Sequence, residues 1–296
     1  MSKDPVKIEG RDIYLAESVS IQKRHFIGRE RELTLCKAAW GIDVNNKLKD
    51  DDTIPLHFRL QGPPGFGKNE IVYELARQLN MELYIIQGHE ELTPEDLALL
   101  IVPGMIPVDP DYPDQLTQSF VLRASPLATA IYKGGLFFFD EINRVPERAL
   151  SPLSSVLDGR QSIYSAMAGI HIGPRGGDNE ARKRFRFCCA LNPALSQSGH
   201  VLPDYIEQRT LPVIEIDPPP FKELLTILEK TLSPSEPFLD AFVEWYNEDQ
   251  DREISVRQAI ALMNYAINYK SHSDDSEIGI LRGVQSAIFG KQRERY

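Results

Sequence analysis

The chain has 296 residues, of which 42% are hydrophobic and 26% are charged. That balance is typical of a globular protein, and the length suggests about two domains. Lys and Arg number 33 against 43 Asp and Glu, so the formal net charge is −10. Nucleic acid and anionic lipid repel an acidic chain at long range, which argues against a general binder of either.

The cysteines, histidines and apolar runs indicate whether the protein has disulfides, a metal site or a membrane segment. Cys188 and Cys189 are adjacent and Cys36 lies far from them, which gives neither a disulfide framework nor a CxxC metal pattern. The six histidines stand singly, without metal-ligand spacing. The first residues lack an apolar signal segment and no long apolar run occurs, so we expect a reduced, cytoplasmic protein with no membrane segment.

Short apolar runs alternate with helical patterns in the first two thirds of the chain. Strands are predicted at residues 56–60, 81–86, 136–139, 185–191 and 211–216, with a helix at 69–79 after the first of them. Residues 136–139 are continuously apolar, as in a strand that is covered on both faces of a parallel sheet. The pattern predicts an α/β fold with a doubly wound parallel sheet.

Three consecutive prolines at 218–220 end this alternation, because no helix or central strand can cross them. Helical patterns follow at 221–232, 238–247 and 255–269, and no convincing strand follows. We therefore predict an α/β domain at residues 1–217 and a smaller all-α domain at 218–296.

A glycine-rich turn follows the first predicted strand. The segment GPPGFGKN fits the phosphate-binding pattern GxxxxGK between a strand and a helix, with a chance glycine-rich turn as the alternative. Its glycines let backbone N–H groups face one anion, and Lys68 can reach the outer phosphates. Asn69 replaces the usual Ser or Thr ligand of Mg²⁺, yet its carboxamide oxygen is still a hard neutral donor. The predicted nucleotide-binding residues are Gly62, Pro63, Pro64, Gly65, Phe66, Gly67, Lys68, Asn69 and Glu70.

Two carboxylates follow the apolar strand at 136–139. Asp140 would hold the metal together with Asn69, and Glu141 would polarise the attacking water as general base. Adjacent acids repel each other, so a cation or open solvent must be near them. A solvated helix start is the alternative for the acid pair alone. Together the two motifs predict a site for ATP and Mg²⁺, although no motif separates ATP from GTP.

These motifs resemble those of AAA+ ATPases and, more narrowly, of the MoxR branch with CbbQ, NorQ and the dynein-related group. The resemblance rests on the segments GPPGFGKNE, GLFFFDEINRVPERALSPLSSVLDGRQ and FCCALNP. It implies a P-loop NTPase sheet followed by a helical lid, with an insert at about 90–114 and a hairpin at about 160–187.

The resemblance also implies roles for residues outside the two motifs. Asn192 matches sensor 1, which positions the attacking water, and Arg257 matches sensor 2, which reaches from the lid to the γ-phosphate. Arg209 matches the arginine finger that acts in a neighbouring subunit's site, although the family's Asp-Arg-Phe triplet is Gln-Arg-Thr here. Ile27 and Gly28 match the segment that flanks the adenine.

One stretch departs from the acidic character of the chain. Residues 171–187 carry five basic and two acidic residues. A pore or substrate loop, a phosphate-contacting loop and a plain solvated loop all fit this composition, and the sequence leaves them open.

Three functions therefore stay open. The first is a homo-oligomeric ATPase, a hexameric ring by resemblance, that remodels, assembles or activates a protein client or a partner of the von Willebrand A type. The second is an ATP-gated binding or assembly module with little turnover, which Asn69 motivates. The third is a nucleic-acid motor of restriction type, against which the net charge counts.

Overall fold

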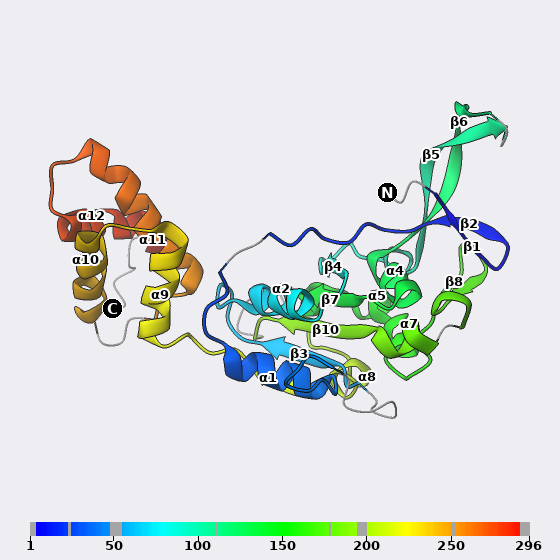
Figure 1. The fold of residues 1–296 in the computed structure, drawn as a ribbon, viewed down its shortest axis with the longest axis horizontal. Helices are drawn as coiled ribbons and strands as arrows, with labels where there is room; N and C mark the ends of the chain where they lie inside the picture. Colours follow the sequence, from blue (N-terminus) through cyan, green and yellow to red (C-terminus); the bar gives the residue numbers. More distant parts are fainter. Residues whose placement is uncertain are drawn as a thin grey trace. The chain divides into compact units, whose positions relative to one another are not determined.

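The computed structural model describes residues 4–22, 25–47, 55–109, 112–177, 179–193, 200–249 and 253–290. The chain divides into two compact units. The first unit comprises Met1–Gln22, Glu32–Gln61 and Val72–Glu215, and the second comprises Lys23–Arg31, Gly62–Ile71 and Ile216–Tyr296. Figure 1 labels the helices and strands of both units.

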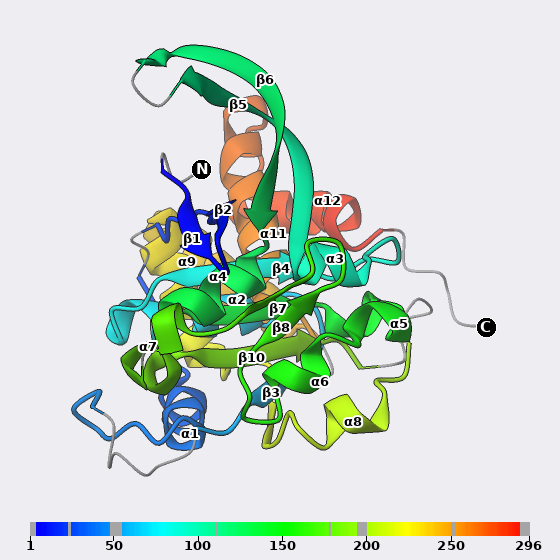
Figure 2. The ribbon, with the colours of Figure 1, turned by 90° about the vertical axis from the view of Figure 1, so that its right-hand side faces the viewer.

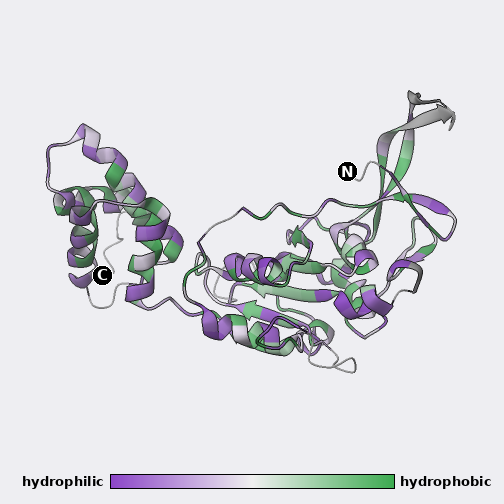
Figure 3. Ribbon diagram, viewed as in Figure 1, coloured by the Kyte–Doolittle hydropathy of each residue, from purple (hydrophilic) through white to green (hydrophobic). Residues whose placement is uncertain are grey.

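A five-stranded sheet forms the centre of the first unit (Figure 1). Its strands lie in the order β11-β3-β10-β7-β4, and every neighbouring pair is parallel. They are β3 (Phe58–Gln61), β4 (Leu83–Gln87), β7 (Leu136–Asp140), β10 (Arg186–Leu191) and β11 (Val213–Glu215). The apolar run of β7 is fully buried, and Figure 3 shows these central strands as mainly hydrophobic. The predicted parallel α/β sheet is confirmed.

Short helices connect and cover these strands. They are α1 (Glu30–Ala39), α2 (Lys68–Gln78), α3 (Pro94–Leu97), α4 (Pro126–Lys133), α5 (Glu147–Leu150), α6 (Leu153–Val156), α7 (Asn179–Arg184) and α8 (Asp204–Glu207), with 3₁₀ turns η1 (Ile142–Arg144) and η2 (Arg175–Gly177). Helix α4 shows how local sequence sets these elements. The Ser125 hydroxyl accepts a hydrogen bond from Ala128 N at 2.9 Å, and Gly134 ends the helix in a left-handed conformation.

A second sheet extends from the first unit in the order β1-β2-β6-β5. It contains β1 (Val6–Ile8), β2 (Arg11–Tyr14), β5 (Leu99–Asp109) and β6 (Tyr112–Ala124). The long β5–β6 hairpin rises from the unit in Figure 2, and β2 pairs in parallel with the base of β6. The insert that we expected at about 90–114 thus contains α3 and β5, while β6 continues beyond it. The sequence patterns indicated neither β1 nor β2.

The basic stretch is mainly helical rather than a loop. An antiparallel pair, β8 (Ile163–Ser165) and β9 (Ile170–Ile172), forms a short hairpin inside the range expected at about 160–187. It is followed by η2 and by α7, which carries Arg182, Lys183 and Arg184 in its last turn. Asp178 lies outside the described residues.

The carboxyl-terminal part is helical. It contains α9 (Phe221–Leu232), α10 (Glu236–Asn247), α11 (Val256–Tyr269), η3 (Lys270–His272) and α12 (Glu277–Phe289). Leu228, Phe242 and Leu262 are fully buried in a shared core, and the Trp245 Nε1 group donates to Gln285 Oε1 at 2.9 Å. Three of these helices match the predicted patterns, whereas α12 is additional.

Three cysteines lie in the described parts of the chain, and all are free and buried. Burial raises the pKa of the Cys189 thiol to about 12. The described residues hold no group of three or more His, Cys, Asp or Glu that could bind a metal ion. Among the same residues, we find no helix with the length and apolar character to cross a bilayer.

Candidate nucleotide-binding site

The acid pair lies at the carboxyl edge of the central sheet. Asp140 is the last residue of β7 and pairs with Gln87 at the end of β4. Glu141 follows in a left-handed conformation with φ 52°, which turns the chain out of the strand and into η1. The buried residues Ile142 and Asn143 anchor that turn, so the strained conformation of Glu141 is held by its neighbours.

Among the described residues, three side chains contact the Glu141 carboxylate. Asn192 Nδ2 donates to Oε1 at 3.4 Å, and Gln87 Nε2 donates to Oε2 at 3.3 Å. Arg144 Nε forms an ion pair with Oε2 at 3.3 Å. The Glu141 side chain is 19% exposed, so its carboxylate still reaches solvent while amides from two neighbouring strand ends fix its direction.

Asn192 follows β10, and Asn143 holds its backbone in place. The side chain of Asn143 is buried and its Nδ2 donates to Asn192 O at 3.1 Å, while the backbone carbonyl of Asn143 accepts from His200 N at 2.7 Å. The structure thus brings together the predicted base Glu141 and the predicted sensor Asn192.

A glycine makes this close arrangement of strand ends possible. Gly88 N donates to Asp140 O at 2.8 Å, and a Cβ atom on Gly88 would lie 2.3 Å from Glu141 O. No side chain fits in that space. Sequence reasoning missed Gly88, Gln87, Asn143 and Arg144, because their partners are distant in sequence or lie on a turn whose shape was not foreseen. The sequence Gln-Gly directly after a predicted strand was the available signal.

The glycine loop belongs to the second unit. It runs between the end of β3 and the start of α2, with Gly65 at φ 86° and Gly67 at φ 91°, conformations that favour glycine. The Lys68 side chain is buried, and its Nζ donates to Gly62 O at 2.6 Å and to Pro63 O at 2.9 Å. Asn69 and Glu70 occupy the first turn of α2, and Pro64 and Phe66 complete the loop.

Arg257 lies beside this loop within the second unit. Its backbone N donates to Gly65 O at 3.4 Å, and a Cβ atom on Gly65 would lie 3.3 Å from Arg257 Cβ. Ser255 caps α11 just before it, with its hydroxyl accepting from Gln258 N at 3.1 Å. The cap therefore fixes the start of the helix that carries Arg257.

The segment that contains Ile27 and Gly28 also reaches the glycine loop. Arg29 Nη2 donates to Phe66 O at 3.0 Å and to Asp217 O at 2.7 Å. Gly28 lies against α9, where a Cβ atom would lie 2.1 Å from Glu223 Oε2. One guanidinium thus ties the amino-terminal segment to the loop and to the start of the carboxyl-terminal part.

Arg209 lies in the first unit, just after α8. Its Nη1 group donates to Tyr205 O in α8 at 2.9 Å. The predicted site residues therefore form two groups. Asp140, Glu141, Asn192 and Arg209 belong to the first unit, and the glycine loop, Ile27, Gly28 and Arg257 belong to the second.

The comparison with known families decides the class of protein. Residues 57–209, more than half of the chain, match the family described as "AAA domain (dynein-related subfamily)". The chain belongs to this family. The match includes the glycine loop, the acid pair and Asn192, and it ends at Arg209.

Curated relatives of this AAA domain protein are distant. "Denitrification regulatory protein NirQ" of Stutzerimonas stutzeri is 26% identical over 110 residues, 37% of this chain and 36% of that protein. An uncharacterized protein of Staphylococcus haemolyticus is 26% identical over 136 residues, 46% of this chain and 49% of that protein. The chain thus matches less than half of the length of each relative.

Solved structures show the same fold. The "Holliday junction branch migration motor" RuvB of Thermotoga maritima has a TM-score of 0.52 at 16% identity, over 88% of this chain and 70% of that one. A point mutant of the same RuvB has a TM-score of 0.53 at 17% identity, over 89% of this chain and 71% of that one. At this identity the likeness concerns the AAA+ P-loop sheet and its helical carboxyl-terminal part.

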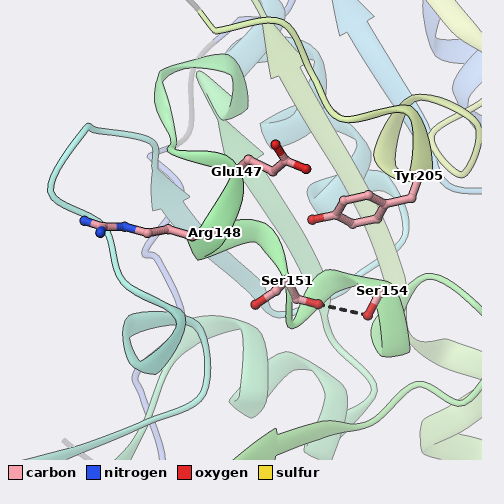
Figure 4. Close-up of a pocket in the computed structure, with 5 residues that line it drawn as sticks. All are labelled: Glu147, Arg148, Ser151, Ser154 and Tyr205. Atoms are coloured by element: carbon pink, nitrogen blue, oxygen red, sulfur yellow. Dashed lines mark hydrogen bonds between the residues drawn. The ribbon is translucent and has the colours of Figure 1, made fainter.

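The AAA domain also has an open groove of about 510 Å³ between α5, α6 and α8 (Figure 4). Its lining residues are Glu147, Arg148, Ser151, Ser154 and Tyr205. Burial and the neighbouring Glu147 carboxylate raise the pKa of Tyr205, partly offset by Arg209. No predicted site residue lines this groove.

Proposed function

We propose that this AAA domain protein is a ring-forming ATPase that couples ATP hydrolysis to the remodelling, assembly or activation of a protein partner, as in the MoxR branch. The observation that carries the proposal is the solvent-reaching carboxylate of Glu141 at the end of β7, held by Asn192 and Gln87. Membership of the AAA family supports it, because proteins of this family are generally ATPases.

The glycine loop fits a triphosphate. Positive φ angles at Gly65 and Gly67, a buried ammonium at Lys68 and the start of an 11-residue helix are the features with which backbone and side chain hold phosphate oxygens. Asp140 and Asn69 supply the oxygen donors that would hold Mg²⁺. The ion, when bound, screens charge on the phosphates.

The remaining residues have separable tasks in this proposal. Glu141 takes a proton from the attacking water, and Asn192 orients that water by hydrogen bonding. Arg257 of the same subunit and Arg209 of a neighbouring subunit stabilise negative charge on the transferred phosphoryl group. Ile27 and Gly28 flank the base.

The direct test is a Glu141→Gln variant, which keeps the shape of the side chain and removes the base. We expect Mg²⁺-dependent phosphate release by the natural protein and a loss of at least about 100-fold in the variant, with ATP affinity retained. Glu147→Gln, at an exposed glutamate of α5, is the matched control and should hydrolyse normally. Equal background rates in the natural protein and in Glu141→Gln would show that the proposal is wrong.

Asn69 favours one second candidate, an ATP-gated binding or assembly module with little turnover. Its amide lies one bond further from the backbone than the hydroxyl that usually holds Mg²⁺, which slows turnover if the ion is poorly placed. A sharp rise in hydrolysis in Asn69→Thr supports this candidate. Lost hydrolysis in Asn69→Thr supports the first proposal, with Asn69 as a working ligand.

The partner follows from the same analogy. A protein client or a partner of the von Willebrand A type is what the MoxR resemblance implies. Co-purification of the Glu141→Gln variant with ATP tests this, because a subunit that binds but does not hydrolyse retains its partner.

A further inference from the structure

Arg59 is the charged residue of β3, and its side chain is only 11% exposed. A guanidinium at this depth depends on hydrogen-bond acceptors, and because the Arg59 Nε has none among the described residues, its contacts are made by Nη1 and Nη2. Its backbone N donates to Pro212 O at 3.2 Å, and its side chain turns to the segment just before that residue. Arg59 therefore contacts one stretch of chain through both backbone and side chain.

The side-chain contacts of Arg59 lie on either side of Arg209 in sequence. Its Nη1 group lies 3.3 Å from Glu207 O and 3.3 Å from Thr210 Oγ1, and its Nη2 group lies 4.0 Å from the Glu207 carboxylate. Thr210 is fully buried and donates in turn to Ile206 O at 2.8 Å. The turn that carries Arg209 is thus fixed at both ends, while Arg209 itself stays partly exposed.

The position of Arg59 in the sequence relates these contacts to the proposed nucleotide site. β3 continues after Gln61 into the glycine loop along the chain, and the same strand contacts the turn with Arg209 through Arg59. An arginine is suited to this because its planar group serves several acceptors at once in a fixed geometry.

We propose that Arg59 is a positioning residue that holds the 207–210 turn so that Arg209 reaches the nucleotide of the neighbouring subunit. This inference rests on the proposed ATPase function. A positioning role for Arg59 differs from a purely structural role in the site that its loss impairs. Because Arg209 acts in trans, loss of Arg59 must impair the neighbour's site and leave the subunit's own site intact.

Mixed rings test this directly. Arg59→Gln alone is expected to lose most of its ATPase activity and to keep its own ATP affinity. Glu141→Gln subunits cannot hydrolyse, but they still present Arg209. In an equimolar mixture, an Arg59→Gln site beside a Glu141→Gln neighbour is complete, so activity should recover to about a quarter of the natural rate under random assembly.

The reference mixture is Arg209→Ala with Glu141→Gln, whose ATPase activity should recover to the same level. The control variant is Arg11→Gln, at an exposed arginine of β2, which should have the activity of the natural protein. If the reference mixture recovers and the Arg59→Gln mixture does not, Arg59 serves its own site or the fold, and the inference is wrong. An Arg209→Ala variant with natural activity also overturns it. A natural protein without ATPase activity refutes the proposed function itself.

A second pair of variants keeps the test decisive if Arg59→Gln does not fold. Thr210→Val removes the acceptor hydroxyl and keeps the shape of the side chain, and Arg59→Lys keeps the charge without the planar fork. If either variant alone keeps a fraction f of the natural activity, its equimolar mixture with Glu141→Gln should show about (1 + f)/4 of the natural rate, because the sites beside a Glu141→Gln neighbour are complete. A mixture at about f/2 would place the defect in the variant's own site and would contradict the inference.

Discussion

Glu141, the proposed general base, has a strained backbone conformation. A non-glycine residue in the left-handed region costs about 1 kcal/mol or more, and such residues persist where their surroundings hold them. Here the side-chain amides of Gln87 and Asn192 donate hydrogen bonds to the Glu141 carboxylate. The buried residues Ile142 and Asn143 follow Glu141 in η1. The strain therefore directs the proposed base along the carboxyl edge of the sheet.

Gly88 is predicted to be indispensable to this arrangement. Because a Cβ atom would lie 2.3 Å from Glu141 O, Gly88→Ala must displace the backbone of Glu141. We expect ATP hydrolysis to fall by at least about tenfold while ATP still binds, since a displaced base loses its alignment with the attacking water. Phosphate release and calorimetric ATP titration measure the two quantities. Gly173→Ala, where the nearest atom lies 3.9 Å away, is the matched control, and equal loss in both would contradict the prediction.

His57 should make stability depend on pH. Burial, aided by the positive charge of Arg186, lowers the pKa of His57 to about 4, and its ring contacts Phe187 edge-on. Between about pH 6.5 and pH 4 the unfolded chain therefore binds a proton that the folded protein does not. Stability that is present above pH 6.5 is lost as the pH falls through this window.

The corresponding variant is His57→Gln, which cannot take up that proton. We expect its free energy of unfolding to fall less between pH 7 and pH 4.5 than that of the natural protein, by about 1–2 kcal/mol. Urea unfolding at the two pH values measures it. His272→Gln, at an exposed histidine of η3, is the matched control. A His57→Gln slope equal to the natural one would refute the pKa argument.

At the scale of elements, a serine cap at the start of a helix has different consequences in α11 and in α12. At the start of α11 the Ser255 side chain accepts a hydrogen bond from Gln258 N, and at the start of α12 the Ser276 side chain accepts one from Gly279 N. Ser276 is exposed, whereas Ser255 is buried beside Gly65 and immediately precedes Val256 and Arg257. Capping stabilises both helices, but only the Ser255 cap lies next to the proposed nucleotide site.

Ser255→Ala and Ser276→Ala are therefore predicted to differ in function and to agree in stability. Each should lower the stability of its helix by about 1 kcal/mol, the usual value of a serine cap. Only Ser255→Ala should also weaken ATP binding, by about threefold to tenfold, because the start of α11 places Arg257. Amide hydrogen exchange and ATP titration separate the two effects. Unchanged ATP affinity in Ser255→Ala would contradict the proposed role of this cap.

At the scale of the whole molecule, net charge opposes self-assembly. Each chain carries a formal charge of −10, so the subunits of the proposed ring would repel one another, and salt would screen that repulsion. ATP would then have to supply favourable contacts, among them the proposed contact with Arg209 of the neighbour.

We predict that the Glu141→Gln variant assembles with ATP and Mg²⁺, and that assembly increases between about 0.05 M and 0.3 M salt, where the screening length shortens. Mass photometry gives the distribution of oligomers, and Lys68→Ala should stay monomeric under both conditions. Assembly that weakens with salt would show that attractive ion pairs, rather than net repulsion, govern the interface.

Local patterns in the sequence were sufficient for much of this protein. The spacing of the glycine loop, the apolar strand before Asp140, and the helical periodicity around Phe242 and Leu262 depend on neighbours in the chain. They predicted the parallel sheet, its order of motifs, and three of the four long carboxyl-terminal helices. The missed helix α12 has a serine cap and apolar residues at helical spacing, so the signal for it was present.

Tertiary structure decided what depends on residues distant in sequence. The pairing of β2 with β6, the contact of Gln87 with Glu141, and the reach of Arg59 to the 207–210 turn join segments from about 50 to about 150 residues apart. Propensity and periodicity describe a residue's immediate neighbours along the chain, whereas these contacts arise when packing of the apolar core sets strand order. The sequence therefore determined which candidate site residues are present, and the packed sheet determined which side chains hold them in place.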